Sequence, residues 1–64
     1  MNIRDIRMSN KMTQTELSIA LNVGRSTVSM WETGESKPTV DKLIAMSKIF
    51  GCTVDELLGV SDEK

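Results

Sequence analysis

The chain has 64 residues, a formal net charge of −1 at pH 7 and a pI near 5.2. This length predicts one domain, close to the lower size limit at which a hydrophobic core alone offsets chain entropy, with no room for an ordinary cofactor pocket. Because there is no histidine and a single cysteine, Cys52, neither a protein zinc site nor an internal disulfide framework can form, and we expect no metal and no cofactor. The apolar runs are short, and the amino-terminal MNIRDIR is charged where a signal peptide needs its apolar stretch. We therefore expect a cytoplasmic protein with no membrane partner.

Acidic charge is concentrated toward the end of the sequence. Residues 53–64 carry a charge of −3, which leaves +2 for residues 1–52. An acidic chain is not typical of nucleic-acid-binding proteins. This distribution nevertheless permits a modest positive face, which must be local.

Helix start signals open the first two predicted elements. Asn2 is expected to cap a first helix, which ends within residues 9–12. Thr13 and Glu16 form a T-x-x-E capping box, in which the hydroxyl and the carboxylate each bind an orphan backbone amide. A second helix therefore begins near Gln14.

The second helix is expected to end at Asn22, a residue that tolerates left-handed geometry. After residues 23–24 a third helix runs to about Thr33, where Gly34 can supply a positive φ. The core-facing residues predicted for the second helix are Leu17, Ser18 and Leu21.

Two further helices follow a loop at residues 35–38. Thr39 can cap the fourth helix and Gly51 can end it, while Thr53 and Glu56 repeat the capping box for a short fifth helix. The apolar stripes at helical spacing are Val40, Leu43, Met46, Ser47 and Phe50, then Val54, Leu57 and Leu58. Since no segment alternates as a strand would, we predict an all-α, compact five-helix domain over residues 1–60 with a short charged tail at 61–64.

The third predicted helix has two contrasting faces. Gly24, Val28 and Trp31 fall on one side, and Trp31 is expected in the core. Arg25 lies at the flank, in the first turn. The opposite side consists of Ser26, Ser29, Met30 and Thr33. Such small polar residues allow close approach to a surface, and their hydroxyls can bind base edges, although an exposed methionine is also ordinary on protein surfaces.

The residues that combine in one known pattern are Ile3, Ile6, Arg7, Thr13-Gln14, Glu16-Leu17, Val23 to Val28, Trp31 to Gly34, Lys37 to Thr39 and Gly51 to Leu58. With them, residues 3–58 resemble the phage-repressor helix-turn-helix family, typified by lambda repressor and Cro (XRE-type). The chain departs from the family pattern at Ser18, where alanine is usual, and at Asn22, where glycine is usual. Both residues are compatible with the turn, since serine is small and its hydroxyl can bond a carbonyl of its own helix.

The resemblance implies which residues face DNA. It places Arg25, Ser26 and Met30 at base edges with Thr27 and Ser29 as neighbours. Arg25 would pair with guanine, a contact worth roughly 1–3 kcal/mol of discrimination, and Met30 would contact a thymine methyl. Backbone contacts would come from Gln14, Thr33 and Lys37. Gln14 could instead be an ordinary first-turn residue, and Lys11 and Lys42 are weaker candidates.

Arg7 and Glu32 have a different implied role. In similar proteins the matching pair joins the first helix to the end of the third as a partly buried ion pair. Removing one partner of a fully buried pair costs roughly 3–5 kcal/mol. The pair would hold the reading helix in place without touching a base.

The function expected from the resemblance is sequence-specific binding of double-stranded DNA through the major groove. The protein would be a small transcriptional regulator, expected to be a repressor, and a homodimer on a pseudo-palindrome with half-sites roughly 34 Å apart. Leu58 and Val60 are the preferred interface residues, ahead of Ile19, Ile44 and Ile49. The alternative, supported by the acidic balance, is a protein-interaction module such as an antitoxin or anti-repressor partner. We expect no enzyme and no small-molecule ligand, because the usual catalytic constellations are absent from the sequence.

Overall fold

The computed structural model describes residues 2–59 of the chain. Within that range the elements are all helices: α1 (Ile3–Ser9), α2 (Gln14–Leu21), α3 (Arg25–Thr33), α4 (Val40–Phe50) and α5 (Val54–Leu58). The predicted all-α, five-helix architecture is confirmed. In the described part of the chain no helix combines the length and apolar character needed to cross a membrane. Val60 and the expected tail at 61–64 lie outside the described residues.

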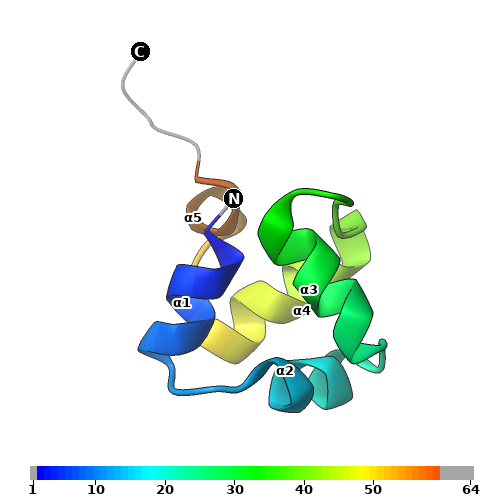
Figure 1. The fold of residues 1–64 in the computed structure, drawn as a ribbon. Coiled ribbons are helices and arrows are strands. Elements are labelled where there is room, and N and C mark those ends of the chain that lie inside the picture. Colours follow the sequence, from blue (N-terminus) through cyan, green and yellow to red (C-terminus); the bar gives the residue numbers. More distant parts are fainter. Residues whose placement is uncertain (1, 60–64) are drawn as a thin grey trace.

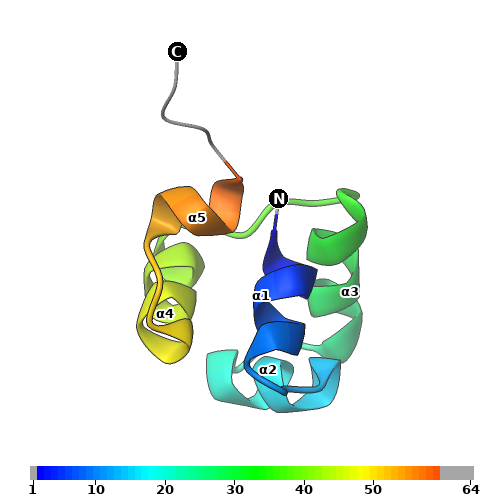
Figure 2. The same cartoon turned by 90° about the vertical axis from the view of Figure 1, so that its left-hand side faces the viewer.

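The five helices surround one core. α2 lies across one end of the group, below α1 and α3, while α5 lies at the other end beside the start of α1 (Figure 1). Seen from the side, α1 lies towards the viewer, with α4 to its left and α3 to its right (Figure 2). A main-chain hydrogen bond of 2.8 Å from Asn2 N to Leu57 O joins the two ends of the described chain.

The core is built from one face of each helix. Val28 is fully buried and Trp31 is 4% exposed, which confirms Trp31 as a core residue and fixes which side of α3 packs inward. The other buried apolar residues are Ile3, Leu17, Leu21, Leu43, Met46, Phe50 and Leu57. Burial of these side chains holds α3 by its inner face, while Arg25, Ser26 and Thr33 remain exposed to solvent.

The predicted capping boxes are present at both α2 and α5. At α2 the Thr13 amide donates to Glu16 Oε1 at 2.8 Å and the Glu16 amide donates to Thr13 Oγ1 at 3.0 Å. Asn22 ends α2 in the predicted left-handed conformation, with φ +59°. Ser18 is buried and its hydroxyl donates to Thr15 O at 2.7 Å. The two departures from the family pattern are therefore accommodated inside a regular helix-turn-helix.

Two expectations about helix starts were wrong. Asn2 does not cap α1 with its side chain, since its ψ of 21° is not the extended geometry that a side-chain cap requires, and its Nδ2 instead donates to Glu56 O at 3.3 Å. Val40 is 69% exposed rather than part of the α4 core stripe. At 100° per residue, Val40 lies about a quarter turn away from the centre of the packed face of α4.

Candidate nucleic-acid interface

The outer face of α3 presents the predicted base-contacting residues in two degrees of exposure. Arg25 and Ser26 are exposed at its start, and Thr33 is exposed at its end. The half-buried residues are Thr27, Ser29 and Met30. Ser29 and Met30 were expected to point fully outward, but on a helix they flank the buried positions 28 and 31 on either side, so neighbouring elements partly cover them.

An ion pair fixes α3 against α1. Arg7 Nε donates to Glu32 Oε2 at 2.6 Å, and Arg7 Nη2 lies 3.4 Å from Glu32 Oε1. The two side chains are 11% and 5% exposed, respectively. Arg7 Nη1 also donates to Met12 O at 2.7 Å, which secures the connection from α1 to α2. One guanidinium of α1 thus holds both α3 and the connection that leads into α2.

The Gln14 side chain is engaged inside the protein. Its Nε2 donates to Glu32 Oε1 at 2.9 Å, and its Oε1 lies 3.4 Å from Arg25 Nη1. The family resemblance implied that Gln14 binds DNA backbone, and it indicated no partner within the chain. No sequence signal connects residues 14 and 32, since the contact depends on how α2 and α3 cross.

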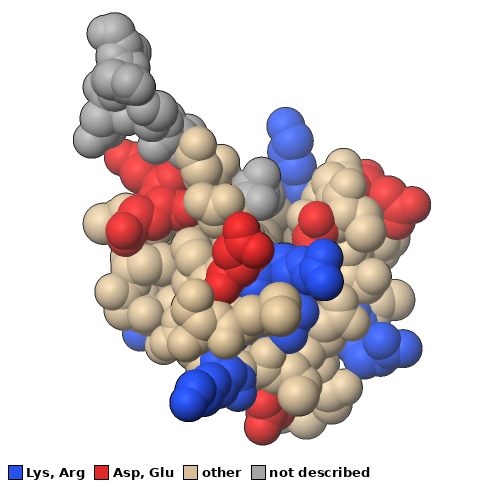
Figure 3. Space-filling model, turned by 60° about the vertical axis from the view of Figure 1, so that its left-hand side comes forward, with Lys and Arg blue, Asp and Glu red and all other residues tan. Residues whose placement is uncertain are grey.

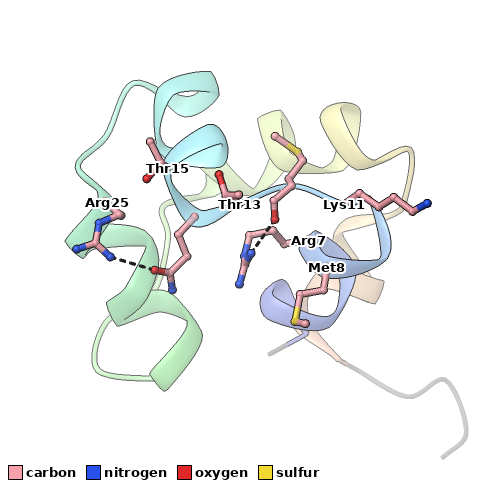
Figure 4. Close-up of a pocket in the computed structure, with 8 residues that line it drawn as sticks. Arg7, Met8, Lys11, Thr13, Thr15 and Arg25 are labelled. Atoms are coloured by element: carbon pink, nitrogen blue, oxygen red, sulfur yellow. Dashed lines mark hydrogen bonds between the residues drawn. The ribbon is translucent and has the colours of Figure 1, made fainter.

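A groove of about 580 Å³ lies beside the start of α2. Arg25 borders it on the α3 side, and Arg7, Met8 and Lys11 border it on the α1 side, with Thr13 and Thr15 between them (Figure 4). The Lys11 side chain extends outward at the far edge (Figure 4). Free amides at a helix start and flanking cations favour an anion.

The residues predicted to contact the DNA backbone differ in whether their side chains already form hydrogen bonds within the protein. Lys37 is exposed in the loop after α3. The Thr33 hydroxyl donates to Met30 O at 3.2 Å, so it closes the end of its own helix. Lys42, a weaker candidate in the sequence, donates from Nζ to Leu21 O at 2.7 Å. This bond directs the Lys42 charge toward the end of α2.

Sequence reasoning overlooked Arg4. It is exposed on α1 and lines a second hollow of about 270 Å³, together with Ser29 and Thr33 of α3. The signal available was its spacing, three residues before Arg7 on the same helix. Arg4 therefore adds a cation beside the outer face of α3.

Basic side chains lie as separate groups among acidic and neutral ones over the face shown in Figure 3. The positive charge near α3 comes from single residues, such as Arg4, Arg25 and Lys37. This arrangement agrees with the small net charge of the chain, and it limits long-range attraction of a polyanion.

The candidate dimer residues occupy different environments. Leu58 is half-buried and packs against the core. Val60 lies outside the described residues. Ile19, Ile44 and Ile49 are 73%, 43% and 38% exposed, respectively.

Comparison with known proteins identifies the fold that carries this site. A family model described as "Helix-turn-helix" matches residues 3–57. The chain belongs to this helix-turn-helix family. The resemblance inferred from the sequence is therefore confirmed over almost the whole described chain.

Relatives within the family include named regulators. The chain is 39% identical over 62 residues to the HTH-type transcriptional regulator DicA of Escherichia coli (strain K12), covering 97% of this chain and 46% of DicA. It is 38% identical over 56 residues to the HTH-type transcriptional activator BcrR of Enterococcus faecalis, covering 88% of this chain and 28% of BcrR. With the cryptic phage CTXphi transcriptional repressor RstR of Vibrio cholerae, identity is 28% over 60 residues, covering 94% and 54%.

A solved structure shares the helix arrangement. The crystal structure of a transcriptional regulator from Listeria innocua superimposes with a TM-score of 0.87 at 30% sequence identity, covering 98% of this chain and 59% of that chain. The chain thus spans about half the length, or less, of the curated relatives DicA, BcrR and RstR.

Proposed function

We propose that this domain binds double-stranded DNA in a sequence-specific manner by placing α3 in the major groove, as part of a transcriptional regulator. The observation that carries the proposal is the fixed orientation of α3. Burial of Val28 and Trp31 turns Arg25 and Ser26 outward at the start of the helix, where recognition helices contact base edges. We propose a cytoplasmic location for this binding.

Base reading is assigned to Arg25, Ser26 and Met30, with Thr27 and Ser29 as close neighbours. The exposed guanidinium of Arg25 can pair with O6 and N7 of guanine, and the thioether of Met30 can contact a thymine methyl. Lys37, the exposed end of α3 at Thr33 and the free amides near Gln14 would contact phosphates. Each phosphate contact fixes the position of the domain along the DNA without selecting a base sequence.

We further propose that two copies bind a pseudo-palindromic site, because a single short helix contacts too few base pairs to specify one site in a genome. The end of α5 is the suggested contact, with Leu58 supplying its exposed part. Sedimentation with and without operator DNA tests this step. Leu58→Glu should prevent pairing on DNA while Ile19→Glu, on the exposed side of α2, should not; the reverse result would move the interface to α2.

One relative is named an activator and another a repressor, so the sign of regulation is assigned to the operator position rather than to this domain. The sequence-based expectation of a repressor is tested by a reporter that keeps the natural spacing of the operator and its promoter, where occupancy should lower transcription.

Selection of bound sequences from a random duplex pool at about 100 mM salt, a concentration at which phosphate contacts are already weakened, tests the proposed DNA binding. A motif with a guanine position that disappears in Arg25→Ala supports it. If Arg25→Ala weakens all sequences equally, Arg25 is a phosphate contact. If the wild type enriches no motif, the proposal fails and a protein-interaction module becomes the better explanation.

A further inference from the structure

The turn that ends α1 is a Schellman motif with a lysine at its left-handed position. The Lys11 amide donates to Met8 O at 2.9 Å, and the Met12 amide donates to Arg7 O at 3.1 Å. These two bonds are the pair that defines the motif. Its left-handed residue is usually glycine, but here it is Lys11, with φ +58°. A side chain therefore projects from a position where the backbone conformation disfavours one.

A lysine near the end of a helix has a local explanation if its ammonium meets the last carbonyls. Lys42 does this at the end of α2, where its Nζ donates to Leu21 O. Among the described residues the exposed Lys11 ammonium forms no hydrogen bond and no ion pair, and its side chain extends away from the turn in Figure 4. No bond of this side chain to a described residue therefore offsets the backbone strain. Outliers of this kind cluster at functional sites.

Lys11 borders the same groove as the start of the reading helix. Arg25 stands on the α3 side of this groove of about 580 Å³, and Lys11 stands on the opposite side (Figure 4). In the proposed docking of α3 in the major groove, Arg25 faces base edges. The sugar–phosphate strand that bounds the major groove then passes over the start of α2 toward Lys11. An exposed ammonium at that edge can meet a phosphate of this strand.

The turn is fixed relative to α3 by the arginine of the buried ion pair. Arg7 Nη1 donates to Met12 O at 2.7 Å, while Arg7 Nε donates to Glu32 Oε2 at 2.6 Å. One guanidinium therefore holds both the turn that carries Lys11 and the end of the reading helix. A phosphate contact made from such a fixed turn sets the position of the reading helix along the DNA.

We propose that Lys11 is a phosphate-binding residue: its ammonium contacts the DNA backbone at the edge of the groove beside α2, and the strained left-handed turn places it there. The inference deepens the proposed function and rests on it for the docking of α3. It adds a contact that contributes affinity and position without base preference. As a consequence, the stability of the domain and its affinity for DNA should respond in opposite directions when residue 11 becomes glycine.

Two substitutions separate the charge of Lys11 from the strain of its backbone. Lys11→Met removes the charge and keeps the Cβ, so it should weaken DNA binding without stabilising the domain. Lys11→Gly removes both, so it should weaken binding to the same extent while raising the urea midpoint of unfolding. Lys11→Arg keeps the charge and should retain the affinity. Urea unfolding of each variant also gives the folded fraction, by which the affinities are corrected.

Titrations of a duplex that carries the selected motif, at several salt concentrations, measure the effect on binding. Lys11→Met should lower affinity by about 1.5- to 5-fold, the value of one exposed ion pair, and the slope of log affinity against log salt should become shallower by about 0.9. The loss should be the same on duplexes in which each base of the motif is changed in turn. The matched control is Lys48→Met, because the exposed Lys48 of α4 does not line the groove. It should leave affinity and slope unchanged.

The possible outcomes distinguish this inference from the proposed function. Wild-type affinity and salt slope in Lys11→Met would overturn the inference while sequence-specific binding stands. A loss confined to one base position would also overturn it, since Lys11 would then read a base. Weakening by Lys11→Met but not by Lys11→Gly would assign the loss to the methionine side chain and overturn it as well. If the wild type enriches no motif, the proposed function fails and this inference fails with it.

Discussion

Lys42 of α4 donates a hydrogen bond from Nζ to the main-chain oxygen of Leu21, the last residue of α2, over 2.7 Å. The last carbonyls of a helix have no partners within it, and a cation there also meets the negative end of the helix dipole. This single contact ties the start of α4 to the end of α2, immediately before the turn that leads into α3. Lys42 thus has a structural role that its charge alone did not indicate.

Replacing Lys42 by methionine should lower the free energy of unfolding by about 1 kcal/mol, because one carbonyl loses its protein donor while the apolar stem is kept. Urea denaturation measures the change. Lys48→Met, in the last turn of α4 where the side chain is exposed, is the matched control and should change stability by less than about 0.5 kcal/mol. Equal effects of the two substitutions would show that the bond to Leu21 contributes nothing measurable.

Breaking the pair between Arg7 and Glu32 should be far more damaging. The Glu32 side chain is only 5% exposed. Arg7→Met removes the cation that pairs with this buried carboxylate, so the free energy of unfolding should fall by about 3 kcal/mol or more. The double variant Arg7→Met, Glu32→Met removes the stranded charge and should recover part of that loss. Thermal unfolding of the wild type, Arg7→Met, Glu32→Met and the double variant measures the difference. A double variant as unstable as the sum of the two single changes would show that no coupling exists.

Lys37 and Arg25 should be separable on DNA once an operator has been selected. Lys37→Ala should weaken binding to all sequences and lower the slope of log affinity against log salt by about 0.9 for each phosphate that the protein no longer neutralises. Arg25→Ala should instead abolish one base preference. Titrations of wild type and variants at several salt concentrations measure both effects. An unchanged slope in Lys37→Ala would remove Lys37 from the set of phosphate-binding residues.

Cys52 offers a test of the local environment at the start of α5. Burial raises the pKa of its thiol, and the nearby Glu56 carboxylate raises that pKa further. The neutral thiol is favoured in the folded state, so its contribution to stability is complete below the unfolded-state pKa and is lost as pH rises through that value toward the folded pKa. Iodoacetamide should react with the folded protein along a pH profile displaced to higher pH than that of the urea-unfolded chain. Coincident profiles would contradict the shift.

Local sequence signals predicted the helices well because their causes are local. The capping box of Thr13 and Glu16 depends on residues three apart, and the left-handed end at Asn22 depends on one side chain. The bond between Gln14 and Glu32 joins residues that are 18 positions apart in the sequence. The bond between Lys42 and Leu21 joins residues that are 21 positions apart. They depend on helix crossings that no short pattern contains. Burial of Trp31 was predictable from its helical face, whereas the exposure of Val40 depended on what α4 packs against.

Lys11 shows the same limit of local sequence signals. It adopts φ +58° between α1 and α2, a left-handed conformation that costs a lysine roughly 1–2 kcal/mol. A lysine side chain gives no sequence signal for this conformation. Lys11→Gly should remove this strain at an entropic cost of about 0.5–1 kcal/mol, so a net gain in stability of up to about 1.5 kcal/mol is expected. Asn22→Gly, at φ +59°, should gain less because asparagine already tolerates this conformation. If Lys11→Ala stabilised the domain as much as Lys11→Gly in urea unfolding, relief of backbone strain would not be the cause, since alanine keeps the Cβ that makes the conformation costly.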